Sequence, residues 1–194
     1  EVIDAVYRFR DRLDDTLDGS IKQLVVQLAN RAADTWPEPD AGMWEARDHQ
    51  RHHVSSKVMC WVALDRAIRL APQLDVADTS AWEAARDAVH AAVLEQGWNA
   101  DVQSFTGVFG SDHLDASVLL MVLVDFLPAS DPRIRATIRT IERELSLNGQ
   151  VYRWKGEKNT FLLCTYWLVE ALVLIGDVER AQKLFEETTA YAND

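Results

Sequence analysis

Cysteine, glycine and proline are all scarce in this chain. Its 194 residues include two cysteines, eight glycines and five prolines. Cys60 and Cys164 each lie inside an apolar run, which indicates buried free thiols and no disulfide framework. No apolar run reaches the length of a membrane span, since residues 161–175 are interrupted by Thr165 and Glu170. No N-terminal signal pattern is visible, and we expect a cytoplasmic protein.

Basic residues are also in the minority. The 20 Lys and Arg residues face 31 Asp and Glu residues, giving a formal net charge of −11. A nucleic-acid-binding surface needs clustered cations, so we expect no nucleic-acid partner and no membrane partner. The length is enough for one domain with a real core. The sequence does not indicate an oligomeric state.

Apolar spacing favours helices over strands. Strand-like alternation is scarce, whereas apolar residues recur at i, i+3 and i+4, which predicts an all-α fold. Ser20, Asp131 and Asp177 are expected N-caps, and Gly97 and Gly176 are expected helix ends. The pattern predicts about eight helices, over residues 2–13, 21–36, 54–71, 80–96, 115–126, 131–148, 160–175 and 177–192.

The predicted helices alternate between two kinds. The third, fifth and seventh are apolar nearly all round and should be buried on all sides, whereas the even-numbered ones carry a charged face. This alternation indicates an inner and an outer layer. Each inner helix follows a long polar loop, so these loops should meet at one rim. The rim would collect Trp36, Trp44, Glu45, Arg47, Trp98, Phe105, Asp112, Tyr152, Arg153 and Trp154.

The longest of these loops, residues 36–57, has the residue types of a sugar site. A Trp ring can stack on a pyranose, an arginine can hold hydroxyl groups, and a carboxylic acid can protonate a glycosidic oxygen. An ordinary capped loop whose Trp packs on the rim is the alternative, and composition alone favours it. His49, His52 and His53 beside Asp48 fit no standard zinc spacing, so we expect no metal and no cofactor.

Three blocks of the chain carry recognisable motifs. They are PDAGMWEAR and SKVMCWVALDRA within residues 39–67, FGSD and LDAS within residues 109–117, and TFLLC and WL within residues 160–168. In this order they resemble bacterial members of glycoside hydrolase family 15, the glucoamylase, glucodextranase and trehalase relatives. The resemblance covers essentially the whole chain and makes the sugar-site interpretation of the loop the favoured one.

The resemblance implies a fold and a reaction. The family's catalytic domain is an (α/α)6 barrel of twelve helices, which fits the predicted alternation, and its members cleave α-glucosidic bonds with inversion. The family's general acid is the Glu that follows Trp, which is Glu45 here. A carboxylic acid acts as a general acid near neutral pH when burial disfavours its charged form, so Glu45 is expected to lie buried beside Trp44.

Other residues would bind the substrate. The resemblance implies that Trp44 stacks on the sugar and that Arg153 contacts hydroxyl groups. The remaining substrate-binding candidates are Arg47, Lys57, Asp115 and Trp36. The resemblance supports substrate binding less strongly for Lys57 and Asp115, and their alternative role is to organise the rim.

Parts of the family pattern are missing from this chain. The block with the catalytic base should follow residue 194, and the block that binds the terminal glucose should precede residue 1. His53 and Lys158 also depart from the pattern, which has an aromatic residue and Glu there. We therefore expect residues 1–194 to form a single all-α domain, an incomplete barrel that lacks its first and last helices and is inactive alone. The alternative function is a non-catalytic α-helical repeat module that binds a partner protein, which the last helix pair resembles.

Overall fold

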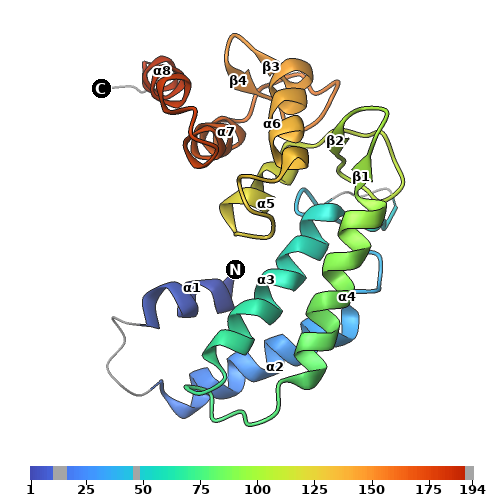
Figure 1. Cartoon of the computed structure of the whole chain (residues 1–194), viewed down its shortest axis with the longest axis vertical. Coiled ribbons are helices and arrows are strands. Elements are labelled where there is room, and N and C mark those ends of the chain that lie inside the picture. Colours follow the sequence, from blue (N-terminus) through green and yellow to red (C-terminus); the bar gives the residue numbers. More distant parts are fainter. Residues whose placement is uncertain (11–16, 46–48, 191–194) are drawn as a thin grey trace. The chain divides into compact units, whose positions relative to one another are not determined.

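The computed structural model describes residues 1–10, 17–45 and 49–190. The chain divides into two compact units, Glu1–Leu94 and Glu95–Asp194, and each is considered by itself (Figure 1). Across the described residues, no helix combines the length and the apolar character that crossing a membrane requires.

The first unit is built around one buried helix. It contains α1 (Val2–Phe9), α2 (Gly19–Thr35), α3 (Val54–Leu70) and most of α4 (Ser80–Gln96). Helix α3 packs against both α1 and α2, and α4 lies beside it (Figure 1). The apolar run of α3 explains its central place, because a helix that is apolar on several sides needs neighbours on several sides.

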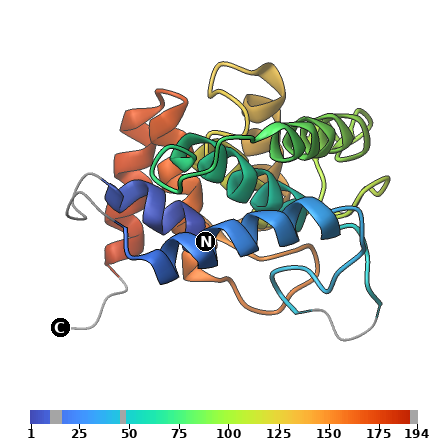
Figure 2. The same cartoon turned by 90° about the horizontal axis from the view of Figure 1, so that it is seen from below.

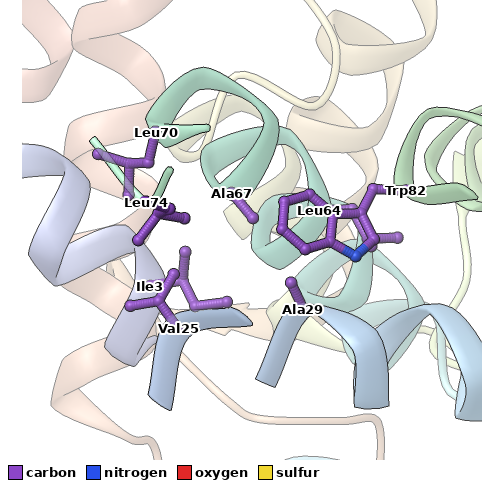
Figure 3. Packing of buried hydrophobic residues seen from close by; sticks show 8 residues of the cluster. All are labelled: Ile3, Val25, Ala29, Leu64, Ala67, Leu70, Leu74 and Trp82. Atoms are coloured by element: carbon purple, nitrogen blue, oxygen red, sulfur yellow. The ribbon is translucent and has the colours of Figure 1, made fainter. Parts of the chain in front are cut away.

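The core of this unit lies between these helices. The aromatic ring of Trp82 reaches into it from α4, and its indole nitrogen donates a 2.8 Å hydrogen bond to Asn30 Oδ1 on α2. This bond satisfies the polar atom of an otherwise apolar side chain. Figure 3 shows the cluster, which consists of Ile3, Val25, Ala29, Leu64, Ala67, Leu70, Leu74 and Trp82.

A buried ion cluster attaches α1 to α3. Arg66 is 3% exposed, and its Nε donates to Asp4 Oδ1 at 3.0 Å while its Nη1 donates to Asp65 Oδ2 at 2.5 Å. Arg69 adds a 2.9 Å ion pair with Asp65. Because every buried charge in this cluster has a partner of opposite sign, the cost of removing the charges from water is offset.

The second unit combines helices with two short antiparallel hairpins. Strand β1 (Trp98–Asn99) pairs with β2 (Ser104–Phe105), and β3 (Ser146–Leu147) pairs with β4 (Gln150–Val151). The helical elements are η2 (Ala116–Leu119), α5 (Leu120–Leu123), α6 (Pro132–Leu145), α7 (Leu162–Leu174) and α8 (Val178–Thr189).

Each hairpin is fixed to a helix by a buried threonine. The backbone N–H of Phe105 in β2 donates to Thr137 Oγ1 of α6 at 3.0 Å. In the same way the N–H of Val151 in β4 donates to Thr165 Oγ1 of α7 at 3.0 Å. All four residues are at most 1% exposed, so each hydroxyl satisfies a backbone donor that water does not reach.

The structure confirms several predicted helices and their signals. Helix α3 begins at Val54 as predicted, and α4 has the predicted bounds. Asp131 caps α6 by accepting from the N–H of Arg133, with Pro132 in the first turn. The cap of α2 was predicted wrongly. Its first turn is capped by Asp18, which accepts from the N–H of Ser20, because the helix starts at Gly19.

Two predicted helices of the second unit are shorter than expected. The helix predicted over residues 115–126 is a 3-10 turn followed by the single turn α5, because Asp125 takes a left-handed φ of 60° and lets Phe126 fold back into the core. Helix α6 ends at Leu145, well before residue 148. The Asn148–Gly149 pair, with φ values of 51° and 81°, forms the turn between β3 and β4 instead.

Helix α7 is not buried on all sides, which corrects the prediction from its apolar sequence. One side, including Cys164, Leu168 and Leu172, is buried against the rest of the unit. The other side leaves several large apolar side chains 39–50% exposed: Phe161, which caps the helix, and Leu162, Leu163, Val173 and Leu174. Within the second unit, the neighbours of α7 are α5, α6, α8, η2 and β4, which cover one side.

Candidate active site

A long loop connects α2 to α3 (Figure 2). Backbone pairing closes this loop at its base. Asp40 and Arg51 form an isolated antiparallel bridge, with both N–H to O distances at 2.9 Å. The bridge brings the two ends of residues 40–51 together. Loops whose ends lie close together in this way are frequently functional.

The carboxylate of Asp40 organises the loop from within. Its Oδ1 accepts from the backbone N–H of Gly42 at 2.7 Å and from Ser56 Oγ at 2.6 Å. The first bond is the turn that Asp forms with the backbone two residues on, and it sets the direction of the chain toward Trp44. The second connects the loop to the first turn of α3. The sequence interpretation missed both Asp40 and Ser56, although the Asp-x-Gly spacing is a turn signal that could have found Asp40.

Lys57 lies under this loop, in the first turn of α3. Its side chain is only 2% exposed. Its Nζ donates to the carbonyl oxygen of Glu38 at 2.5 Å and lies 3.4 Å from Asp40 Oδ2. From the sequence, Lys57 is one of the less strongly supported candidates for substrate binding. In the structure its ammonium group donates a hydrogen bond to the backbone of the loop.

The Trp44–Glu45 pair forms the turn at the tip. The N–H of Glu45 donates to the carbonyl of Gly42 at 3.2 Å, and Glu45 has a left-handed φ of 53°. Residues with a side chain are uncommon in this region, and Glu45 shares it with Asp75, Gln103, Asp125 and Asn148 among the described residues. Trp44 is half-buried and Glu45 is exposed, so the expected burial of Glu45 beside Trp44 is absent from this structure.

The other predicted residues of this loop have different positions. Trp36 is the half-buried residue that ends α2, where its N–H donates to the carbonyl of Ala32 at 3.2 Å. Arg47 lies outside the described residues. The first unit therefore contains four of the predicted residues, in this loop and in the helix ends that flank it: Trp36, Trp44, Glu45 and Lys57.

In the second unit, Arg153 is held by an acid that the sequence interpretation did not select. Its Nε donates to Glu157 Oε1 at 2.8 Å, its Nη2 contacts the same oxygen, and its backbone N–H donates to Glu157 Oε2 at 3.1 Å. The carboxylate of Glu157 raises the pKa of the Arg153 guanidinium. The i, i+4 spacing of the two residues is a weak signal outside a helix, so it did not single out Glu157.

Aromatic rings complete the surroundings of Arg153. The guanidinium carbon lies 4.5 Å from the centre of the Trp154 ring and 5.4 Å from that of Phe161. Cation–π contact at these distances is attractive and restricts the plane of the guanidinium. Arg153 is thus presented in a fixed orientation, with Trp154 beside it.

Asp115 is a buried organiser of the same region. It is 5% exposed, and its Oδ1 accepts from the N–H of Ser117 at 2.8 Å, which caps η2. It also forms a bridge with Trp154, and the next residue, Ala116, donates to the carbonyl of Arg153 at 2.8 Å. A Cβ atom at Gly107 would lie 2.7 Å from Asp115 Cβ, so the close approach here requires glycine.

The predicted rim residues are therefore distributed over both units. Within the described residues, the histidine-rich segment 49–53 joins no group of three or more His, Cys, Asp or Glu side chains that could hold a metal ion. Of the two free thiols, Cys164 is buried as predicted, whereas Cys60 is only partly buried.

Comparisons with known proteins agree with the motif blocks. The family model described as "Glycosyl hydrolases family 15" matches residues 1–193. Proteins named "Trehalase" from Mycolicibacterium smegmatis and Mycobacterium tuberculosis are 41% and 40% identical over 99% of this chain. The chain spans 30% and 29% of the length of these two relatives.

The fold is shared with solved structures. A structure described as "Glycosidase Wild Type" superimposes with a TM-score of 0.75 at 19% identity, covering 83% of this chain and 44% of that one. A likeness at this identity concerns the fold alone. It confirms the predicted class, a portion of an all-α toroid.

Proposed function

Because this chain belongs to glycosyl hydrolase family 15, we propose that it is part of an inverting glycosidase that acts on α-linked glucosides, with Glu45 as the general acid. The observation that carries this proposal is the Trp44–Glu45 turn. It combines a stacking ring, a carboxylic acid and a strained φ of 53° on a loop tied at its base. The exposed position of Glu45 would let the acid meet a substrate, whose own bulk would then exclude water from it.

In the proposed reaction, Glu45 protonates the glycosidic oxygen as the bond breaks. Inversion requires a second carboxylate that activates a water on the opposite face of the sugar, at about 6.5–9.5 Å from the acid. We place this base beyond residue 194. Trp44 stacks on the pyranose ring, and Trp36 and Arg47 contribute further contacts.

Arg153 contributes a fixed donor for sugar hydroxyl groups. Its ion pair with Glu157 and its contact with Trp154 orient the guanidinium before any substrate arrives. Such preorganisation lowers the entropic cost of binding. Asp115 supports the same segment from beneath, as an organiser of the rim.

The relatives suggest which substrate to test first. Both mycobacterial relatives are named trehalases, and we propose trehalose as the preferred substrate of the complete enzyme. Maltose and isomaltose are the comparison substrates, since each joins its two glucose units through a different α-linkage.

The test is glucose release by the full-length gene product that contains this chain. Glu45→Gln should lower the turnover of trehalose about 10²- to 10⁴-fold, the usual contribution of a general acid. Glu38→Gln is the matched control, because Glu38 is an exposed residue of the same loop whose contact with Lys57 is made by its backbone carbonyl, which the substitution preserves, and this variant should keep its activity. If the wild type releases glucose from none of the three sugars, or if Glu45→Gln retains full activity, the proposal is wrong and a helical binding module becomes the better account.

A further inference from the structure

The ammonium group of Lys57 is buried where a charge is costly. With 2% of its side chain exposed, Lys57 is among the largest fully buried side chains of the described residues. An ammonium group removed from water needs hydrogen-bond acceptors and an opposite charge to persist. The loop between α2 and α3 provides the acceptor through the carbonyl of Glu38 and the opposite charge through the carboxylate of Asp40.

A continuous series of contacts leads from Lys57 to Glu45. Lys57 Nζ faces Asp40 Oδ2 at 3.4 Å, and the other oxygen of Asp40 accepts from the N–H of Gly42 at 2.7 Å. The carbonyl of Gly42 in turn accepts from the N–H of Glu45 at 3.2 Å. The series gives Lys57 a connected route, through Asp40 and Gly42, to the backbone of Glu45.

We propose that Lys57 is a positioning residue, which sets the place of the Glu45 carboxylate through Asp40 and Gly42 and does not contact the sugar. This inference rests on the proposed role of Glu45. Its ground is geometric, since an ammonium group that is buried and already engaged with two loop oxygens has no exposed surface to offer a substrate.

A positioning role has a specific kinetic signature. A displaced general acid fails to protonate the leaving oxygen in the transition state, whereas ground-state binding of the sugar through other groups is preserved. Removal of Lys57 should therefore lower kcat by about 10²-fold, the effect of a misplacement of about 1 Å, and leave KM within about a factor of two. Loss of a direct sugar contact would instead raise KM.

The experiment compares Lys57→Met with Lys22→Met in the full-length gene product. Methionine keeps most of the apolar stem of lysine, and Asp40 is 36% exposed, so the variant leaves no buried charge without water. Lys22 is the matched control, because its Nζ pairs with Asp75 Oδ2 at 2.7 Å in the same unit but away from the loop. Lys22→Met should leave both kcat and KM unchanged.

Hydrogen exchange gives a second readout that does not require activity. In Lys57→Met the amides of Gly42 and Glu45 should exchange about tenfold faster or more, because the local opening of the loop becomes easier. In Lys22→Met they should exchange as in the wild type. Unchanged exchange at both amides in Lys57→Met would overturn the inference.

The outcomes separate this inference from the proposed function. If the wild type is active and Glu45→Gln is not, but Lys57→Met keeps its kcat or raises only KM, then the positioning role is wrong and the function stands. If Lys57→Met does not fold, Ser56→Ala decides the matter, since it removes the 2.6 Å bond to Asp40 Oδ1 from a half-buried site. A lowered kcat with unchanged KM in that variant supports the positioning role, and an unchanged kcat overturns it.

Discussion

The imidazole ring of His53 lies directly against Gly42, so that a Cβ atom at position 42 would meet the ring's Cγ and Nδ1 at 2.8 Å. Gly42 also has a left-handed φ of 69°. Two separate constraints therefore require glycine at this position, just before the Trp44–Glu45 turn. The contact also shows how the end of the loop, where His53 precedes α3, supports its tip.

Gly42→Ala should be more damaging than an ordinary glycine substitution. The left-handed backbone alone costs about 1–2 kcal/mol for a residue with a Cβ, and the contact with His53 adds about 1–3 kcal/mol of overpacking. Gly176→Ala is the control, because Gly176 has a φ of 84° but nothing within 4 Å of its Cβ position. Thermal unfolding of both variants measures their losses of stability. Equal losses would show that the contact with His53 adds nothing to the cost of Gly42→Ala.

The buried threonines should matter through their hydroxyl groups. Thr165→Val keeps the shape of the side chain but leaves the N–H of Val151 buried without its 3.0 Å acceptor. This should lower the free energy of unfolding by about 1–3 kcal/mol. Thr165→Ser retains the hydroxyl and loses one methyl group, at a cost of about 0.8 kcal/mol. Urea unfolding distinguishes them, and a valine variant as stable as the serine variant would contradict the assignment.

The thiol of Cys164 should be inert in the folded protein. Burial, together with the nearby Asp115 carboxylate, raises the pKa of Cys164 to about 12, so almost no thiolate exists at pH 8. Because the thiolate is the reactive form, alkylation by iodoacetamide should be about three orders of magnitude slower than in the unfolded chain. Burial also raises the pKa of Cys60, but this residue is only partly buried and should react sooner. Mass spectrometry of the labelled protein checks this order, and labelling of Cys164 before Cys60 would contradict it.

The charge of Asp131 should contribute stability that depends on pH. The ion pair with Arg133 lowers the pKa of Asp131. An acid whose pKa is lower in the folded than in the unfolded protein stabilises the fold in full above its unfolded pKa, which is about 3.9 for Asp. This stabilisation is lost as the pH falls through the folded pKa. Asp131→Asn preserves the helix cap and removes the charge.

The stability difference between wild type and Asp131→Asn should be constant from pH 7 to about pH 5 and shrink progressively as the pH falls below the unfolded pKa of Asp. Chemical denaturation across this range measures it. A difference that grows as the pH falls would mean that the Arg133 pair does not stabilise the charged form.

The elements that the sequence predicted well have local signals. The apolar run after His53 predicted α3, and the Asp131–Pro132 pair predicted the start of α6. The end of α5 could not be predicted, because it depends on Asp125 adopting a left-handed conformation so that Phe126 reaches the core. The hairpin turn at 148–149 had a signal, the Asn-Gly pair, which was interpreted as a helix end.

The site was only partly predictable for a related reason. Motif blocks selected Trp44 and Glu45, since these residue types stand together in the sequence. The partners that hold the loop are set by tertiary contacts. The approach of Lys57 to the carbonyl of Glu38, or of Glu157 to Arg153, depends on how the chain returns on itself. Sequence spacing does not encode such contacts.

As the proposed general acid, Glu45 donates a proton to the leaving group. The kinetics of Glu45→Gln on two substrates, measured in the full-length gene product, test this role. Trehalose has a poor leaving group that needs protonation, whereas α-glucosyl fluoride has one that leaves without a proton. Both have the same glucosyl unit, so binding of that unit is matched.

Glu45→Gln should lose about 10²- to 10⁴-fold in kcat on trehalose but keep most of its rate on α-glucosyl fluoride. Glu38→Gln should match the wild type on both substrates. Equal loss on the two substrates, or no loss on either, would contradict the assignment of Glu45 as the general acid.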